Sequence, residues 1–182
     1  MADKEISDFE YHLKEIFRIA KEKYNIDNPL DKSKYREIIV AERLGHNLFK
    51  GASGGKNNDA TYGADAVSSG RKKEYKTVGL TPKQYGQWLN GECSYTPTMI
   101  YNGAYSEENI NRYRDTDHII SLFYNEKNLC NVEVPIDHVT TSLFEVLYKK
   151  EERRNGGEKV TTNCNAVKVK FINNKPQIGR VL

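Results

Sequence analysis

Apolar residues recur at spacings of three and four in several segments of the chain, and this period predicts amphipathic α-helices. Capping residues mark their ends: Asp31 is a predicted N-cap, Gly45 a predicted helix end, and Thr81-Pro82 a predicted helix start. The predicted helices cover residues 8–24, 31–46, 82–90, 107–114 and 137–150. The two N-terminal helices are predicted to serve packing or dimerisation.

Runs rich in β-branched and aromatic residues alternate with these helices and predict β-strands. The predicted strands cover residues 118–124, 129–134, 166–172 and 177–182, with polar turns at residues 125–128 and 173–174. The polar, Tyr-rich segment between residues 91 and 107 is predicted to be a connection. Helices before, between and after a mixed set of strands predict an α/β fold with one central sheet.

A tight β-hairpin is predicted at Ser69-Gly70, because this dipeptide is a two-residue turn signal. If the residues on either side of it close the hairpin, the register brings Asp65 opposite Glu74. Directly opposed Cβ atoms lie about 5 Å apart, where like charges destabilise a strand pair unless a positive charge lies between them. A divalent metal ion would supply that charge, and Lys76 projects from the same strand face as Glu74. The pattern predicts a metal-binding acid pair beside an ammonium group.

This arrangement of residues suits the hydrolysis of a phosphodiester. Oxygen ligands select hard cations such as Mg²⁺, which keeps several waters and accepts phosphate oxygens as further ligands. A metal-bound water is a good nucleophile, and a neighbouring lysine can orient or deprotonate it and offset charge on the phosphate. The alternative interpretation is a surface hairpin whose Asp65, Glu74 and Lys76 are merely solvated.

Composition limits the classes of protein to which the chain can belong. With 182 residues, 37% of them hydrophobic, a single folded domain with its own core is expected. No apolar run approaches the length of a membrane span and no signal-peptide pattern is visible, so a cytoplasmic protein without membrane contact is expected. Three cysteines without CxxC spacing and four scattered histidines indicate neither a disulfide framework nor a zinc site. The net charge of +3 is too weak to indicate a nucleic-acid partner by itself.

Local features nevertheless suggest contacts with a nucleic-acid backbone. Arg71 opens a run of three basic residues beside the hairpin, and such a run can bind phosphates. The glycine-rich segment Gly51–Asp59 is predicted to be a loop, and its Lys56 is a candidate for a similar contact. Glu37 or Glu42 of the second predicted helix could reach a metal, although most helix glutamates are exposed to solvent.

The spacing between Asp65 and the sequence Glu74-Tyr75-Lys76 resembles the signature of PD-(D/E)XK nucleases, with Ala64 in place of the usual proline. The resemblance extends from about residue 36 to residue 172 and includes Ile110–Arg114 with the apolar strand that follows it. It is closest to type II restriction endonucleases of that family. It implies a PD-(D/E)XK core, with a central mixed sheet flanked by helices, and Mg²⁺-dependent, site-specific cleavage of double-stranded DNA.

The resemblance also implies roles for individual residues. The implied catalytic residues are Asp65, Glu74, Lys76 and Tyr113, of which Asp65 and Glu74 would bind Mg²⁺ and Tyr113 would lie near the scissile phosphate. Tyr113 as a core aromatic residue is the alternative. Asn163 would bond the edge of an adenine, as asparagine side chains do in the major groove. The histidine-bearing recognition segment of such an enzyme has no counterpart here, and Asn102 lies in its place.

Enzymes of this kind act as homodimers, because a twofold protein matches a twofold DNA site. The chain is therefore expected to form one nuclease domain over residues 1–182. Residues 1–47 would be a helical part that dimerises, and residues 48–182 would carry catalysis and DNA recognition. Three alternatives stay open: a structure-specific nuclease of the junction-resolvase type, a non-catalytic DNA-binding module of the same fold, and an unrelated protein with a solvated hairpin.

Overall fold

The computed structural model describes residues 2–49, 64–102, 104, 106–160 and 164–182, which form helices on both sides of a β-sheet. The helices are α1 (Ala2–Tyr24), α2 (Lys32–Leu44), α3 (Pro82–Leu89), α4 (Glu107–Asn111), a 3-10 turn (Arg112–Asp115) and α5 (Ile136–Asn155). The strands are β1 (Asn47–Leu48), β2 (Ala66–Ser68), β3 (Arg71–Gly79), β4 (Thr98–Asn102), β5 (Thr116–Tyr124), β6 (Lys127–Val134), β7 (Cys164–Lys168), β8 (Phe171–Ile172), β9 (Lys175–Pro176) and β10 (Arg180–Val181).

The central sheet is mixed, in the strand order β1-β2-β3-β5-β6-β10. The pair β3 and β5 is parallel, and the other four neighbouring pairs are antiparallel. Strands β4 and β7 form a separate antiparallel ribbon, and β8 and β9 form another. The predicted α/β fold, with a central mixed sheet flanked by helices, is confirmed.

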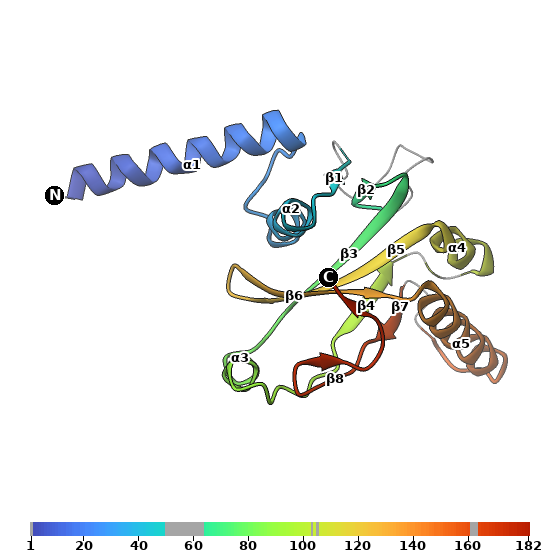
Figure 1. Ribbon diagram of the computed structural model, residues 1–182. Coiled ribbons are helices and arrows are strands. Elements are labelled where there is room, and N and C mark those ends of the chain that lie inside the picture. Colours follow the sequence, from blue (N-terminus) through green and yellow to red (C-terminus); the bar gives the residue numbers. More distant parts are fainter. Residues whose placement is uncertain (1, 50–63, 103, 105, 161–163) are drawn as a thin grey trace.

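The two faces of the sheet are covered differently (Figure 1). On one face, α2 packs Val40 and Ala41 against Tyr75 of β3 and Phe123 of β5. On the other face, the β4–β7 ribbon and α5 enclose the larger core with residues such as Leu143. Helix α1 extends away from this body, and only its last turn approaches α2 (Figure 1). Side chains at the hairpin end of β3 can therefore meet both layers.

Local capping signals were reliable guides to the helix ends. The Asp31 side chain accepts hydrogen bonds from the backbone N–H groups of Ser33 and Lys34, and Gly45 ends α2 with a φ of 67°. Thr81 and Gln84 form a reciprocal capping box at the start of α3. These predictions are confirmed. The caps could be predicted because each depends on residues that are close in sequence.

Strand β4 was not predicted. The segment between residues 91 and 107 reads as a polar connection, but residues 98–102 pair with β7, more than sixty positions away. Met99 and Tyr101 point into the core while Ile100 between them is 52% exposed, so the period of a strand emerges only once β7 is in place. The predicted strand over 166–172 is likewise divided between β7 and β8.

Helices α1 and α5 are longer than predicted, beginning at Ala2 and ending at Asn155 respectively. Within the ranges that the structure describes, no helix has both the length and the apolar character that crossing a bilayer requires. The predicted loop Gly51–Asp59, with Lys56, lies outside those ranges.

Candidate active site

The predicted hairpin register is confirmed. Ala66 lies opposite Lys73, and the strands close at a two-residue turn in which Ser69 and Gly70 have φ values of 51° and 76°. Positive φ at both positions is the geometry that a tight hairpin turn requires. Asp65 comes directly before β2, and its backbone N–H donates a hydrogen bond of 2.8 Å to the backbone oxygen of Lys73, the residue before Glu74. The turn therefore places Asp65 and Glu74 near the open end of the hairpin.

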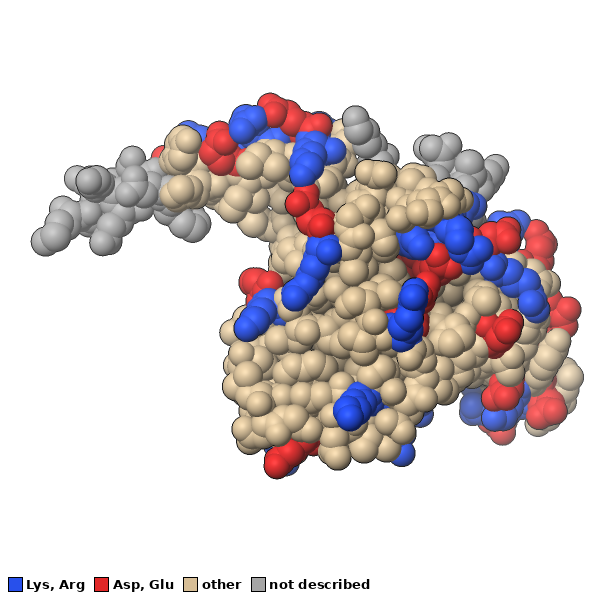
Figure 2. Space-filling model, in the orientation of Figure 1, with Lys and Arg blue, Asp and Glu red and all other residues tan. Residues whose placement is uncertain are grey.

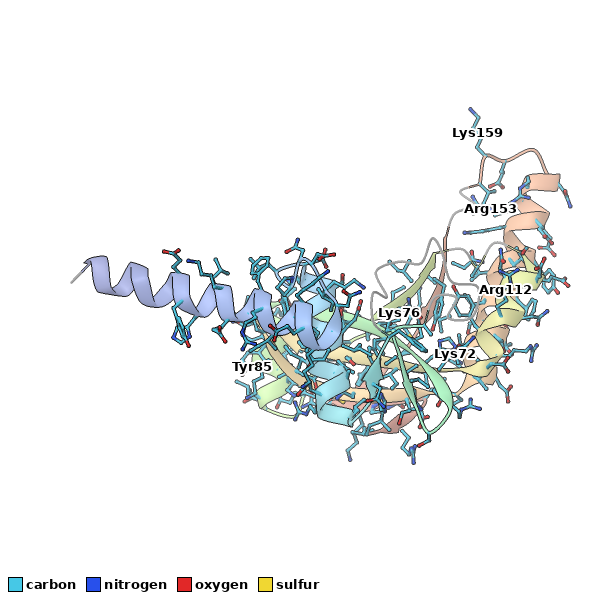
Figure 3. All side chains as sticks on the ribbon, turned by 90° about the horizontal axis from the view of Figure 1, so that it is seen from above. Lys72, Lys76, Tyr85, Arg112, Arg153 and Lys159 are labelled. Carbon is cyan, nitrogen blue, oxygen red and sulfur yellow. The ribbon has the colours of Figure 1, made fainter. Side chains whose placement is uncertain are left out.

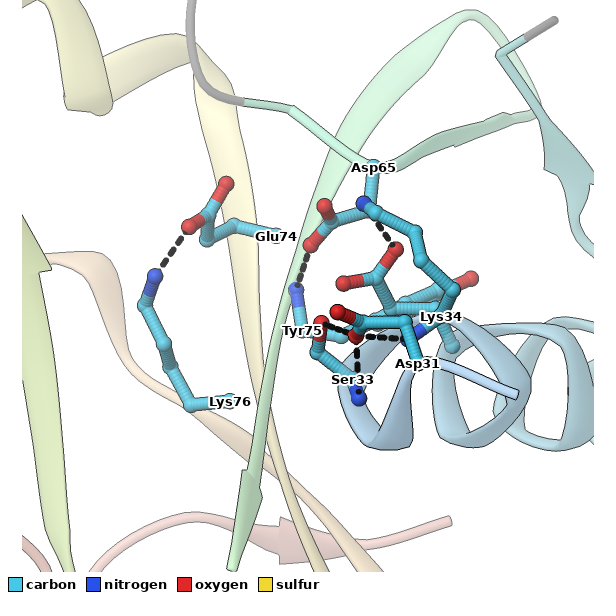
Figure 4. Close-up of polar contacts among 8 residues, drawn as sticks. Asp31, Ser33, Lys34, Asp65, Glu74, Tyr75 and Lys76 are labelled. Carbon is cyan, nitrogen blue, oxygen red and sulfur yellow. Dashed lines mark hydrogen bonds and ion pairs between the residues drawn. The ribbon is translucent and has the colours of Figure 1, made fainter. Parts of the chain in front are cut away.

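The Asp65 carboxylate turns onto the backbone of β3. Its Oδ2 accepts a hydrogen bond of 2.7 Å from the backbone N–H of Tyr75 (Figure 4). Burial and the negative charge of Glu74 together raise the pKa of Asp65 to about 7, against the opposing effect of the hydrogen bond from Tyr75. The two acids therefore share one electrostatic environment while bonding to different partners.

Glu74 is the most deeply buried acid of the site, with 5% of its surface exposed. Its Oε1 forms an ion pair with the Lys76 ammonium (Figure 4), while its Oε2 is buried and has no hydrogen-bond partner among the described residues. Burial raises the pKa of this carboxyl, and Lys76 opposes the rise. A buried, unsatisfied carboxylate oxygen is costly and calls for a cation or a proton. Glu74 is therefore not merely solvated, contrary to that part of the surface-hairpin interpretation.

Lys76 is held between Glu74 and an aromatic ring. Its Nζ lies 4.9 Å from the centroid of the Tyr101 ring, within the range of a cation–π contact. The Tyr101 hydroxyl is 2.8 Å from Nδ1 of His118, and Nε2 of His118 is 3.2 Å from the backbone oxygen of Tyr113. Burial lowers the pKa of His118 to about 4, so the imidazole is neutral at pH 7. A hydrogen-bonded chain in the core thus supports the ring that contacts Lys76.

The structure distinguishes the two glutamates of α2. Glu42 turns away from the sheet and bonds to Lys23 and Tyr24 at the end of α1. Glu37 faces the hairpin and forms an ion pair of 2.9 Å with Lys34. Burial and the charge of Asp65 together raise the pKa of Glu37 to about 7. Only Glu37 therefore belongs to the site.

Other residues singled out from sequence lie farther from this centre or outside the described ranges. Tyr113 is 4% exposed and packs in the core against Tyr101, at 5.1 Å between ring centroids. A contact of Tyr113 with the scissile phosphate therefore stays a prediction, and the structure favours the core alternative. Arg71 forms an ion pair of 2.6 Å with Asp117.

Of the two asparagines predicted to contact bases, Asn102 is the last residue of β4. The backbone of Asn102 pairs with that of Cys164. Asn163, which precedes Cys164 in the chain, lies outside the described ranges, as does Lys56. Because Tyr101 contacts Lys76, this end of the ribbon adjoins the acid pair.

The sequence-based interpretation missed three residues that the fold brings to the site: Lys34, Tyr101 and His118. Nothing in the local sequence distinguishes Lys34 from Lys32, the other lysine of α2. Tyr101 lies in the strand that was not predicted, and His118 was interpreted as one of four scattered histidines. Their contribution depends on contacts between elements, which no short motif encodes.

Mg²⁺ fits the donor set that these residues provide. Among the described residues, no three histidine, cysteine, aspartate or glutamate side chains are grouped closely enough to hold a metal ion together. Protein sites for Mg²⁺ commonly use only one or two carboxylates, with waters and phosphate oxygens as the remaining ligands. Asp65 and Glu74 supply such a pair, and the unpartnered Oε2 of Glu74 is an available ligand.

No family model matches the chain, and no curated protein matches it in sequence.

Proposed function

We propose that this protein is a Mg²⁺-dependent endonuclease with a PD-(D/E)XK core that cuts double-stranded DNA at specific sites. The observation that carries the proposal is the buried, unpartnered oxygen of Glu74, beside the Lys76 ammonium and close enough to Asp65 for their charges to interact. The combination of Asp65, Glu74 and Lys76 suits hydrolysis of a phosphodiester better than a structural role. A purely structural ion pair would not leave a carboxylate oxygen buried and unsatisfied.

Each residue of the site has a distinct role in the proposed reaction. Asp65 and Glu74 hold the metal, which when bound polarises the phosphate and lowers the pKa of a water. The Lys76 ammonium approaches the phosphate and offsets the negative charge that develops in the transition state. Tyr101 limits where that ammonium can go, because its buried ring covers one side of Lys76. The buried position of Glu74 strengthens these electrostatic interactions by keeping water away.

Basic side chains around the site support a DNA backbone as the substrate. Figure 3 shows Lys72 and Arg112 beyond Lys76, with Arg153 and Lys159 farther along towards the end of α5. Arg112 and Arg153 form ion pairs with Glu108 and Glu158, and all four side chains are at least 43% exposed. Exposed ion pairs contribute little stability, so their arginines can exchange a carboxylate for a phosphate.

The charged surface as a whole is mixed rather than uniformly basic. Figure 2 shows Lys and Arg beside Asp and Glu over the region of β2, β3 and α4, while much of the lower body carries few charges. A modest net charge of +3 favours contacts at particular phosphates over general attraction to DNA. We propose that Asn102, at the end of β4, and Asn163 recognise the DNA bases.

The proposed enzyme is a homodimer that uses α1 as its interface. Large apolar side chains of α1 are exposed although the helix is amphipathic: Tyr11 (62%), Ile16 (47%), Phe17 (37%) and Ile19 (45%). Of these, Ile16 and Phe17 lie on the apolar stripe of the helix, and an apolar stripe left in water is typical of a surface that pairs with another helix. Light scattering should give the mass of a dimer, and Ile16→Glu should reduce it to that of the monomer. A monomeric wild-type protein would contradict this part of the proposal.

The experiment that tests the activity is a digest of plasmid and phage DNA of known sequence with purified protein and Mg²⁺. Discrete bands are expected, and end sequencing would then give the recognition site. Lys76→Ala should abolish cleavage and leave DNA binding largely intact. Lys72→Ala on the same strand is the matched control, and it should weaken binding only slightly. A smear, cleavage of four-way junctions only, or an active Lys76→Ala variant would each contradict the proposal.

A further inference from the structure

Lys34 is fixed at the start of α2 by the helix cap. Oδ1 of Asp31 accepts hydrogen bonds from the backbone N–H groups of Ser33 at 2.9 Å and Lys34 at 3.3 Å. Its ammonium lies 2.9 Å from Oε2 of Glu37, one helical turn later. Figure 4 shows the Lys34 side chain reaching from α2 towards Asp65. The cap therefore positions a second lysine on the side of the acid pair opposite Lys76.

The ion pair between Lys34 and Glu37 is unusually well buried for a pair on one helix. Its side chains are 17% and 12% exposed, whereas those of the surface pair between Lys14 and Glu10 are 74% and 61% exposed. A buried ion pair pays a large desolvation penalty and is weak evidence for a gain in stability. Its position beside Asp65 therefore calls for a functional explanation.

The positive charge of Lys34 acts on all three carboxylates of the site. It lowers the pKa of Glu37, and it also acts in the same direction on Asp65 and on Glu74. Three carboxylates and two lysines leave one net negative charge when all are ionised. One divalent cation would change this to one net positive charge, which matches the single negative charge of a phosphodiester. Two divalent cations would leave three positive charges.

The positions of the carboxylates also favour one divalent cation over two. Within the described part of the chain, Glu37, Asp65 and Glu74 do not converge as one three-ligand metal site. A second metal would need Glu37, whose carboxylate is bound to the Lys34 ammonium. It would therefore have to displace that ammonium from a position where it already compensates the negative charge.

We propose that Lys34 takes the place of a second divalent cation, so that the site binds a single Mg²⁺ between Asp65 and Glu74. This inference rests on the proposed metal-dependent function. In the reaction, the Lys34 ammonium neutralises Glu37 and provides a fixed positive charge on the α2 side of the phosphate, while Lys76 provides one on the other side.

The test is the number of divalent ions bound by the whole chain, measured by calorimetric titration with Mn²⁺ and Mg²⁺ without DNA. The wild-type protein should bind one ion. Lys34→Met should bind two, and its first site should tighten about tenfold because a neighbouring positive charge is gone. Lys32→Met is the matched control, since Lys32 is exposed on the same helical turn, and it should still bind one ion. Lys34→Gln, which keeps a donor for Glu37, is the second variant if Lys34→Met does not fold.

The outcomes separate this inference from the proposed function. Two ions bound by the wild type, or only one ion bound by a folded Lys34 variant, would overturn the role of Lys34 and leave a metal-dependent nuclease standing. No binding by the wild type or any variant would overturn both. A double variant, Lys34→Met with Glu37→Gln, should return to one ion, because the second site loses its carboxylate.

Discussion

Replacing Asp65 with Asn should stabilise the metal-free protein at alkaline pH. The pKa of Asp65 is about 7 in the folded protein, against an ordinary value of 3.8. The folded state therefore holds this proton more tightly than the unfolded chain does, and stability falls as pH rises from about 4 to about 7. Above pH 7 the full cost of the buried charge is present. Asparagine carries no charge and can still accept the hydrogen bond from Tyr75.

The magnitude follows from the difference between the two pKa values. At 1.36 kcal/mol for each tenfold change in proton affinity, the ionised Asp65 costs about 4 kcal/mol at pH 8. Rearrangement of Glu74 and Lys76 around the charge reduces this, so a gain of about 2 to 4 kcal/mol is expected for Asp65→Asn. At pH 5 most of the wild-type Asp65 is protonated in the folded state, and the gain should be less than half as large.

Urea denaturation followed by circular dichroism at pH 8 and pH 5, with a chelator present, measures this effect. Asp117→Asn is the matched control, because Arg71 and Lys73 lower the pKa of Asp117 below its ordinary value despite its partial burial. That substitution should destabilise the protein at pH 8, and the loss should diminish as pH falls through the ordinary range of Asp. If Asp65→Asn is no more stable than the wild type at pH 8, the acid pair is not an electrostatically strained site and the reasoning fails.

Three further predictions concern packing and backbone conformation. Tyr101→Leu should reduce the DNA cleavage rate with little change in DNA affinity because Lys76 loses its aromatic contact, while Tyr101→Phe should retain most of the rate; equal losses in both variants would contradict the cation–π role. Thr81→Ala should lower the free energy of unfolding by about 1 kcal/mol in urea, since α3 loses its capping box. Gly179→Ala should destabilise by roughly 1 to 3 kcal/mol, because φ is 98° and the added Cβ would lie 2.5 Å from a backbone oxygen. Gly86→Ala, with open space around it, is the control for that last variant and should not destabilise.

The hairpin shows how much of the site local sequence can encode. Ser69-Gly70 selects one turn geometry and with it the pairing of β2 with β3 as far as Ala66 and Lys73. The two-residue period of a strand then places Lys76 on the same face as Glu74. None of these relations needs any other part of the chain. The same is true of the caps at Asp31 and Thr81, which bond to residues two or three positions away.

Residues that act across layers could not be predicted in this way. Glu37 and Glu42 are equally plausible in the sequence, and the packing of α2 on β3 alone turns Glu37 to the hairpin and Glu42 to α1. Tyr101 reaches Lys76 because β4 pairs with β7, and this pairing also turned a predicted connection into a strand.

The sequence by itself determined the helix ends, the hairpin register and the identity of the acid pair, because each depends on neighbours within a few residues. The tertiary structure decided how deeply Glu74 is buried and which groups surround Lys76. It also decided that Lys34 joins the site. Burial and long-range electrostatics arise only when distant elements pack together, so a motif can name the reacting groups but cannot set their charge or their pKa.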